Sequence, residues 1–509
     1  MVGAFRHHPA TRRSSRRPAS GPSIKLRATH GCRKRYPPSL SESMKTVAES
    51  AISVRIRFCT RQLIHRSIAT CITTGFDDMA VRQLFILGTR GIPARHGGFE
   101  TFAERLALYL TQRGWEVTVY CQSDAAEGAI NEDISEDTWQ GVRRIIVPVT
   151  RAGAVGTMEF DWKSIRDVAA RDPGLVLTLG YNTAVFCTYL RWRGITNIIN
   201  MDGLEWRREK WKLHERLWLW LNERVGCWAG NHLIADHPAI AAHLATRVKR
   251  RKITTIPYGA DPIESMSAVP LRAFDLEDVR YGLVIARPEP ENSVLEIVTA
   301  FSRRPRGARL VVLGKYDATH PYQRAVLDAA SDEVMFPGAI YDQHVVRALR
   351  YHANFYLHGH RVGGTNPSLV EALGAGCAVI AHDNVFNRWV AGPDARFFAT
   401  EADCDMHISA LIGDPATASA MGLASAQRFR SAFRWDSVLA QYEALLDRHA
   451  RPDRQHVAVV PRVSPVTAAA AVAVAAQPAA ALDARVRAER SKADRAVALN
   501  AEHASTQVE

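Results

Sequence analysis

The segment HGHRVGGTNPSLVEALGAGCAVI, residues 358–380, carries the clearest fold signal in the chain. It reads as the end of an apolar strand, a Gly-Gly turn, a short helix opening at Pro367, and a second apolar run. Proline suits the first helical position because its missing N–H would have no partner there, which predicts Asn366 as the N-cap. Strand, helix and strand in this order form the repeating unit of a parallel α/β sheet.

The same alternation extends from this segment in both directions. Short β-branched runs separated by helical patterns form two series, and each series predicts a doubly wound, Rossmann-like parallel sheet. The first series comprises residues 84–87, 117–121, 175–179, 197–200, 232–235 and 253–256. The second starts at Tyr281 and continues through residues 309–313, 334–336, 355–358 and 378–381. Proline and glycine punctuate the chain at 257–259, which predicts two domains, 79–260 and 261–450.

Most of the excess positive charge lies outside these two domains. The chain has 65 Lys and Arg against 52 Asp and Glu, and residues 1–78 hold 15 and 4 of them, so 50 and 48 remain. A nearly neutral remainder argues against a nucleic-acid-binding core. We expect residues 1–78 to be a disordered basic extension, either a transit peptide or the result of a start assigned upstream of Met79. Residues 451–509 are expected to be an Ala-rich, low-complexity tail.

The cysteine spacing predicts a protein of the reducing cytoplasm, and the hydropathy predicts no membrane span. The eight cysteines form neither a CxxC pair nor a zinc-like cluster with histidines, which predicts free thiols and no bound metal. The sequence lacks a run of about 18 apolar residues, so we do not expect a membrane span. Five tryptophans between Trp206 and Trp228 stand near Arg207, Arg208 and Lys210. Core packing is favoured for most of them, and peripheral contact with the anionic inner face of the plasma membrane is the alternative.

A glycine-rich loop follows the first predicted strand, in GTRGIPARHGGFETFAERLALYL. The apolar spacing from Phe99 to Leu110 predicts a helix after the loop. The loop would therefore lie at a helix N-terminus, where backbone amides bind anions, although a tight turn without a ligand is the alternative. The candidate binding residues are Gly88, Thr89, Arg90, Gly97 and Gly98. The spacing is not GxGxxG, and the next strand ends without an acid, which argues against an NAD-dependent oxidoreductase.

A carboxylate follows a predicted strand in NMDGLEWRREKW. Open α/β sheets bind their ligands at the carboxyl ends of their strands, so Asp202 is the candidate acid or base. The alternative is that Asp202 caps a helix beginning near Leu204, because Asp is a preferred N-cap.

The Gly-Gly turn before Pro367 predicts a second anion site, able to hold a diphosphate without a metal. Its candidate residues are Gly363, Gly364, Thr365 and Asn366. Glu371, one turn into the helix, is placed to accept hydrogen bonds from vicinal ribose hydroxyls, and a capping or surface acid is the alternative. Arg287 and Lys315 each follow a strand and are candidates to neutralise a leaving diphosphate, with a surface salt bridge as the alternative.

Together these motifs resemble family 4 of the retaining glycosyltransferases, and within it a rhamnosyltransferase-like subgroup. The matching pieces are ILGTRGIPARHGGFETFAERLA, NMDGLEWRREKW, IPYGAD, HGHRVGGTNPSLVEALGAGCAVIAHDN and FNRWVAG, over residues 84–398. The resemblance implies the GT-B fold, in which two Rossmann-like domains face across a cleft. It also implies a nucleoside-diphosphate sugar bound by the C-terminal domain and a glycan or lipid-linked glycan acceptor bound by the N-terminal one. Transfer, of rhamnose in this subgroup, would proceed with retention, without a metal or cofactor, in polysaccharide biosynthesis.

The resemblance assigns roles to several residues of this chain and leaves some departures. It makes Glu371 the ribose-binding glutamate and Arg287 the phosphate-binding arginine, and it places loop 88–98 at the donor diphosphate and acceptor. Family 4 commonly has glutamate at the position of Gly363, so we expect His358, His360 or turn amides to contact the sugar.

Three further positions depart from the family pattern. Asn292 replaces a lysine, which directs attention to Lys315, while Met201 and Trp389 replace a histidine and a glutamate. Two other functions fit the same motifs: a sugar-nucleotide epimerase of this fold, and a nucleotide-sugar binding protein without activity.

Overall fold

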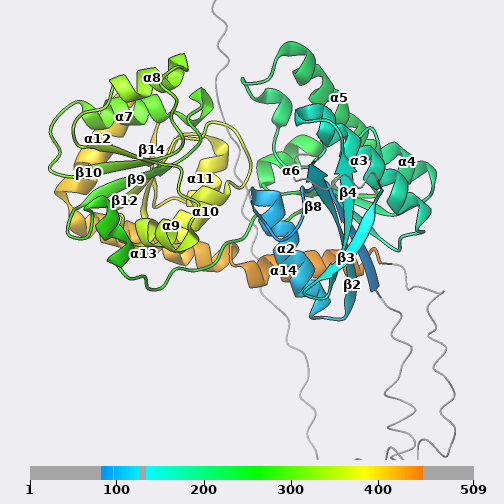
Figure 1. Ribbon diagram of the computed structural model, residues 1–509. Helices are drawn as coiled ribbons and strands as arrows, with labels where there is room; N and C mark the ends of the chain where they lie inside the picture. The colour runs from blue at the N-terminus through cyan, green and yellow to red at the C-terminus, as the bar shows by residue number, and fades with distance from the viewer. Residues whose placement is uncertain (1–81, 96, 125–132, 451–509) are drawn as a thin grey trace, which may run out of the picture. The chain divides into compact units, whose positions relative to one another are not determined.

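The computed structural model describes residues 82–95, 97–124 and 133–450 (Figure 1). The predicted basic extension, 1–78, and the Ala-rich tail, 451–509, therefore lie outside the described residues. Within the described chain, one sheet has eight strands in the order β3-β4-β2-β1-β5-β6-β7-β8, and another has six in the order β11-β10-β9-β12-β13-β14. The prediction of two Rossmann-like α/β sheets is confirmed.

The N-terminal sheet contains all six strands that the sequence predicts. Its strands are β1 (Arg82–Leu87), β2 (Trp115–Asp124), β3 (Ser135–Trp139), β4 (Val142–Val149), β5 (Val176–Leu179), β6 (Asn197–Asn200), β7 (His232–Ala235) and β8 (Ile253–Thr255). Its helices are α2 (Gly98–Thr111), α3 (Gly153–Ala170), α4 (Cys187–Trp192), α5 (Leu213–Ala229) and α6 (Pro238–Leu244). The β3–β4 hairpin is antiparallel, and neither strand was predicted. The polar, mostly exposed residues of β3 have no apolar pattern, whereas β4 has buried residues in alternation and was overlooked.

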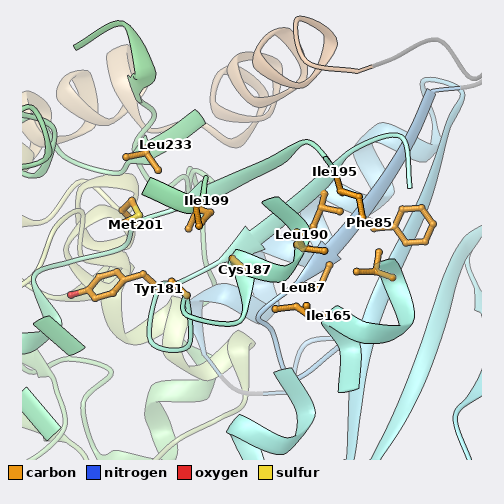
Figure 2. Close-up of a cluster of buried hydrophobic side chains, with 14 of the residues drawn as sticks. Phe85, Leu87, Ile165, Tyr181, Cys187, Leu190, Ile195, Ile199, Met201 and Leu233 are labelled. Carbon is orange, nitrogen blue, oxygen red and sulfur yellow. The ribbon is translucent and has the colours of Figure 1, made fainter. Parts of the chain in front are cut away.

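Helices cover both faces of this sheet. On one face, α3, α4 and α6 contribute to a buried cluster in which Phe85, Leu190 and Ile195 take part, as Figure 2 shows. On the other face, Phe102 and Leu106 of α2 are buried in a second cluster. Each buried Leu or Phe contributes about 1.5–3 kcal/mol relative to an exposed position, so both layers hold the sheet firmly.

The C-terminal sheet is parallel in every described strand pair. Its strands are β9 (Tyr281–Ile285), β10 (Arg309–Leu313), β11 (Val334–Gly338), β12 (Phe355–His358), β13 (Ala378–His382) and β14 (Arg396–Phe398). Its helices are α7 (Val294–Ser302), α8 (Pro321–Asp328), α9 (Gln343–His352), α10 (Pro367–Gly374), α11 (Val385–Ala391), α12 (Glu401–Gly413) and α13 (Pro415–Ala432). The five predicted strands are present, and the short β14 adds an edge.

The last described helix, α14 (Trp435–Asp447), packs on the N-terminal sheet although its residues fall in the predicted domain 261–450. It lies beside α2 (Figure 1), and the rings of Phe102 and Tyr442 are 4.6 Å apart between centroids. Asn200 at the end of β6 donates from Nδ2 to Tyr442 Oη at 3.0 Å. The C-terminal helix thus completes the core of the N-terminal sheet.

The turn after β1 depends on a glycine. Gly88 has φ 81°, and a Cβ there would lie 2.2 Å from the carbonyl oxygen of Leu179 on the neighbouring strand. Gly97, just before α2, has φ 102° but no described atom within 4 Å of an added Cβ. The positive φ disfavours a side chain at both positions, and at Gly88 a side chain would also clash with a backbone oxygen.

Replacing Gly88 with Ala should therefore lower the thermal unfolding midpoint more than Gly97→Ala does. Both substitutions force Ala to a positive φ, which costs about 1–2 kcal/mol, and Gly88→Ala adds the overlap with a backbone oxygen. Differential scanning fluorimetry measures the two midpoints. Equal shifts would contradict the close approach of the two strands.

Candidate functional site

A cavity of about 870 Å³ lies at the carboxyl ends of strands from both sheets. Asp202 follows β6, Asp236 follows β7, and Lys315 follows β10 by one glycine. The volume falls in the range of small-molecule sites. The cavity brings together eight of the residues predicted from the sequence: Gly98, Asp202, Arg287, Lys315, His360, Thr365, Asn366 and Glu371.

The glycine loop after β1 lines a second, smaller cavity of about 130 Å³. Gly88, Thr89 and Arg90 take part in it, with Asp161 and Thr183 from the α3–α4 region. The two cavities share Phe99 and Asn182 in their linings. Gly97 lies outside both linings, at the N-cap of α2. The loop therefore contributes to the neighbouring pocket, and Gly98 reaches the larger one.

The start of α10 has the predicted cap. Asn366 Oδ1 accepts a hydrogen bond from the Ser368 amide at 3.0 Å, with Pro367 at the first helical position, so this prediction is confirmed. The Thr365 amide donates to Asp236 Oδ2 at 2.6 Å, and Thr365 Oγ1 donates to the Asp236 carbonyl oxygen. The amide at the predicted anion site is thus already paired with a carboxylate.

The role predicted for the Gly-Gly turn stays a prediction, and the structure shows where the turn lies. A Cβ on Gly364 would lie 2.1 Å from Asp236 Oδ2, and Gly363 has φ 140°. Both glycines lie outside the lining of the larger cavity, because the turn packs against Asp236 and Gly203. The conformation also accounts for Gly363 in place of a glutamate, since a side chain is strained at this φ. Of the four candidate residues at this turn, Thr365 and Asn366 line the larger cavity.

The side-chain carboxyl groups of Asp202 and Asp236 both have raised pKa values. Burial and the nearby charge of Glu205 raise the pKa of Asp202 to about 6, with Arg208 opposing. Burial and the charge of Asp202 raise the pKa of Asp236 to about 7, and the Thr365 amide opposes this. A carboxyl group with a pKa near neutral pH suits proton exchange with a substrate.

The capping alternative for Asp202 is wrong. The nearest helical turn is a short 3-10 helix, Glu205–Arg207, whose N-cap is Leu204. Asp202 instead has φ 46°, a conformation that is uncommon for residues other than glycine and concentrates at functional sites.

Five cationic side chains line the larger cavity: Arg208, Lys210, Arg287, Lys315 and Arg350. Arg287 has 73 % of its side chain exposed and lies 3.9 Å from Glu289 at the nearest charged atoms, so its guanidinium is accessible to a ligand. Arg208 pairs with Glu205 at 3.0 Å and lies 3.5 Å from Glu291. Arg208 and Lys210 were associated only with the tryptophan segment in the sequence, because their approach to Glu291 depends on the tertiary fold. Clustered cations favour an anionic ligand.

Glu371 lies on α10 and forms an ion pair with Arg350 of α9. The side chain of Arg350 is 6 % exposed and that of Glu371 is 36 % exposed, so the pair holds the carboxylate while leaving one side of it accessible to the cavity. Arg350 was missed in the sequence because it belongs to a helix two elements away.

The two histidines predicted as sugar contacts have different positions. His360 lines the larger cavity, whereas His358 is 1 % exposed and stacks behind it, with ring centroids 4.3 Å apart. Burial holds the pKa of His358 well below its usual value, and burial with the charges of Arg208 and Arg287 lowers the pKa of His360 to about 3. Both rings are therefore neutral at physiological pH. His358 therefore does not reach the cavity where a donor sugar would bind, because its ring is covered by that of His360.

Trp389 now has a structural explanation. Its ring packs edge-on against His237, at 4.7 Å between centroids, and against Phe433, at 5.7 Å. Arg428 donates to the Trp389 carbonyl oxygen at 2.7 Å. The residue thus packs α11 against its neighbours and stands outside the lining of the larger cavity.

Two family models match separate parts of the chain. Residues 81–261 match one described as "Domain of unknown function (DUF1972)", and residues 295–444 match one described as "Glycosyl transferase-like". A search of curated proteins returned no match.

Solved structures of similar fold cover most of the described chain. Sucrose-phosphate synthase from Thermosynechococcus elongatus has 18 % identity and a TM-score of 0.62, over 72 % of this chain and 98 % of that one. HepE of Anabaena, in complex with UDP and glucose, has 13 % identity and a TM-score of 0.57, over 72 % and 99 %. A UDP-forming α,α-trehalose-phosphate synthase from Burkholderia xenovorans has 13 % identity and a TM-score of 0.54, over 72 % and 100 %.

The fold is therefore GT-B, with two Rossmann-like parallel sheets. The match of residues 295–444 adds support for a glycosyltransferase at the level of class.

The raised pKa of Asp236 gives a prediction for stability. Its folded pKa lies above that of an unfolded Asp, so its protonated form stabilises the fold at acid pH, and this contribution is lost as pH rises toward 7. The thermal midpoint of Asp236→Asn, relative to that of the parent chain, should therefore rise between pH 4 and pH 8. Fluorimetry across this range measures the difference.

Asp405→Asn is the control, because the pKa of Asp405 is shifted in the opposite direction. Burial raises the pKa of Asp405, but the ion pairs with Arg306 and Arg304 outweigh burial and lower it. Its stabilising charge is present at and above pH 5, so this variant should have a lower midpoint by a similar amount from pH 5 to pH 8. A flat profile for Asp236→Asn would contradict the desolvated carboxyl group.

Proposed function

We propose that the chain is a glycosyltransferase that binds a nucleoside-diphosphate sugar in the larger cavity and transfers the sugar to a glycan or lipid-linked glycan. The observation that carries the proposal is the convergence of Glu371, five cationic side chains and the start of α10 on one cavity at the strand ends. A carboxylate suits ribose hydroxyls, and cations with a helix N-terminus suit a diphosphate. The match to a glycosyl transferase-like family supports the same reading.

The similar structures suggest which donors to test first. HepE was solved with UDP and with UDP-glucose, and the trehalose-phosphate synthase is UDP-forming. A uridine nucleotide is therefore our first choice, and the rhamnosyltransferase-like motifs add nucleotide-activated rhamnose. We also propose that the chain belongs to family 4, takes part in polysaccharide biosynthesis, and acts in the cytoplasm at the inner face of the plasma membrane.

The proposed reaction uses the two cavities together. The acceptor hydroxyl enters from the smaller cavity, where burial raises the pKa of Asp161 to about 6 and Thr183 Oγ1 donates to Asp161 Oδ2 at 2.7 Å. Its oxygen bonds to the anomeric carbon as the bond to phosphate breaks, and its proton passes to the leaving diphosphate. Attack and departure on the same face retain the configuration. Arg287 and Lys315 neutralise the leaving group without a metal.

Glu371→Gln tests the nucleotide site. The variant keeps the shape of the side chain but removes the charge that would accept the ribose hydroxyls, so we expect nucleotide affinity to fall at least tenfold, which corresponds to about 1.4 kcal/mol. Isothermal titration calorimetry with UDP, GDP, dTDP and ADP measures it. Glu401→Gln is a matched control, because Glu401 has similar exposure, 37 %, and a similar ion pair, with Arg303 at 2.8 Å, on a distant helix. Unchanged affinity in Glu371→Gln would remove Glu371 from the site.

The product distinguishes transfer from the two other functions. With a donor and a glycan acceptor, we expect NMR to show a glycoside with the anomeric configuration of the donor, and EDTA to leave the rate unchanged. Inversion would contradict the same-face mechanism, and loss of activity with EDTA would contradict metal independence. A changed sugar nucleotide without acceptor would indicate an epimerase, and binding without any turnover would indicate an inactive binding protein.

A further inference from the structure

Three helices beside the N-terminal sheet carry an unusual concentration of exposed apolar side chains. The four most exposed tryptophans of the described residues all lie on α3, α4 and α5, and three leucines of α5 are exposed with them. We call this set the aromatic face: Trp162, Trp192, Leu213, Leu217, Trp220, Leu221 and Trp228. Trp192 is 79 % exposed and Leu213 is 82 % exposed. Exposed apolar side chains gathered in this way mark an interaction surface.

The aromatic face is continuous across the three helices. α4 contacts both α3 and α5. The ring of Tyr189 lies 5.9 Å between centroids from Trp162 on one side and 5.9 Å from Trp192 on the other. Arg191 then stacks over Trp228, at 4.7 Å from the ring centroid, and joins α4 to α5.

Helix α5 has two distinct sides. Leu213, Leu217, Leu221 and Trp228 recur at spacings of four and seven residues, which puts them on one side of the helix. The other side is buried and includes Leu219, Asn222 and Glu223. The earlier expectation that most tryptophans of this segment pack in the core is wrong: Trp220 and Trp228 are exposed, and Trp206, Trp211 and Trp218 are only partly buried.

The charges on this face are mostly positive. Arg224 stacks on Trp220 at 3.4 Å from the ring centroid, and Lys212 and Arg216 are exposed beside the leucines. Glu215 is the acid in the same turn, and it accepts a hydrogen bond from the Lys212 amide at 2.7 Å. Apolar side chains flanked by cations match the interface of an anionic bilayer, where tryptophan and leucine enter the headgroup boundary and cations meet lipid phosphates.

We infer that the aromatic face docks on an anionic lipid bilayer. Two hydrogen bonds connect α5 to the segment of the candidate site. On the buried side of the helix, Glu223 Oε2 accepts from Trp206 Nε1 at 2.7 Å, and the exposed Arg216 donates from Nε to the Trp206 carbonyl oxygen at 3.0 Å. Trp206 belongs to the segment that carries Asp202 and Arg208 into the larger cavity. Docking therefore places the cavity beside a lipid-linked acceptor, a conclusion that rests on the proposed function.

The test uses the full chain with vesicles of phosphatidylglycerol brominated in the acyl chains, which quench tryptophan fluorescence on contact. All eleven tryptophans lie between Trp115 and Trp435, so quenching reports on the described part of the chain even where the basic extension also binds the vesicles. We expect quenching with phosphatidylglycerol and at least tenfold weaker binding in the triple variant Leu213→Ser, Leu217→Ser, Leu221→Ser, which keeps every tryptophan.

The control is the triple variant Val269→Ser, Val385→Ser, Leu423→Ser, whose parent side chains are 57 %, 58 % and 73 % exposed elsewhere. It should be quenched like the parent chain. Absent quenching in the parent, or equal quenching in both triple variants, would overturn the inference. So would sedimentation showing that the aromatic face instead joins two copies of the chain. Thermal midpoints and nucleotide calorimetry, made without lipid, keep misfolding and failure of the proposed function distinct from failure of docking.

Discussion

Parallel strand pairing is the constraint on which the candidate site depends. Parallel hydrogen bonding sends the carboxyl end of each strand to the same edge of its sheet, and the polar residues that follow β6, β7, β9 and β10 meet at one cavity for this reason. The partly buried carboxyl groups of Asp202 and Asp236 would be costly there without partners. The Thr365 amide and the Arg208 guanidinium limit that cost, and both groups belong to the lining of the cavity.

The features that were predictable from the sequence are governed by local chemistry. Asn366 and Pro367 define the start of α10 through a cap and a fixed backbone angle, and both act within a few residues. Most strands with buried faces were also predictable, because apolar and β-branched residues indicate burial directly, although β4 was missed. Arg287 and Lys315 follow strand ends, and Glu371 lies one turn into α10, so the local pattern was enough to place all three.

The remaining features depend on contacts between distant parts of the chain. Asp236 follows a correctly predicted strand, but a single acid before His-Pro resembles an ordinary turn, and its role emerges only with Thr365 against it. Arg350 reaches Glu371 from another helix. His358 has the residue type of a ligand contact, yet burial behind His360 decides otherwise. The exposed side of α5 is also a tertiary property, since the same leucines and tryptophans would suit a core.

The central claim is that the larger cavity binds a nucleoside-diphosphate sugar, and a thermal-shift screen tests it most directly. A ligand that binds the native state alone raises the unfolding midpoint, by an amount that corresponds to about 2.7 kcal/mol at a hundred times its dissociation constant. The screen compares UDP-, GDP-, dTDP- and ADP-sugars with the free sugars. The account predicts that at least one nucleotide sugar raises the midpoint and that the free sugars do not. No shift with any nucleotide sugar at millimolar concentration would contradict it.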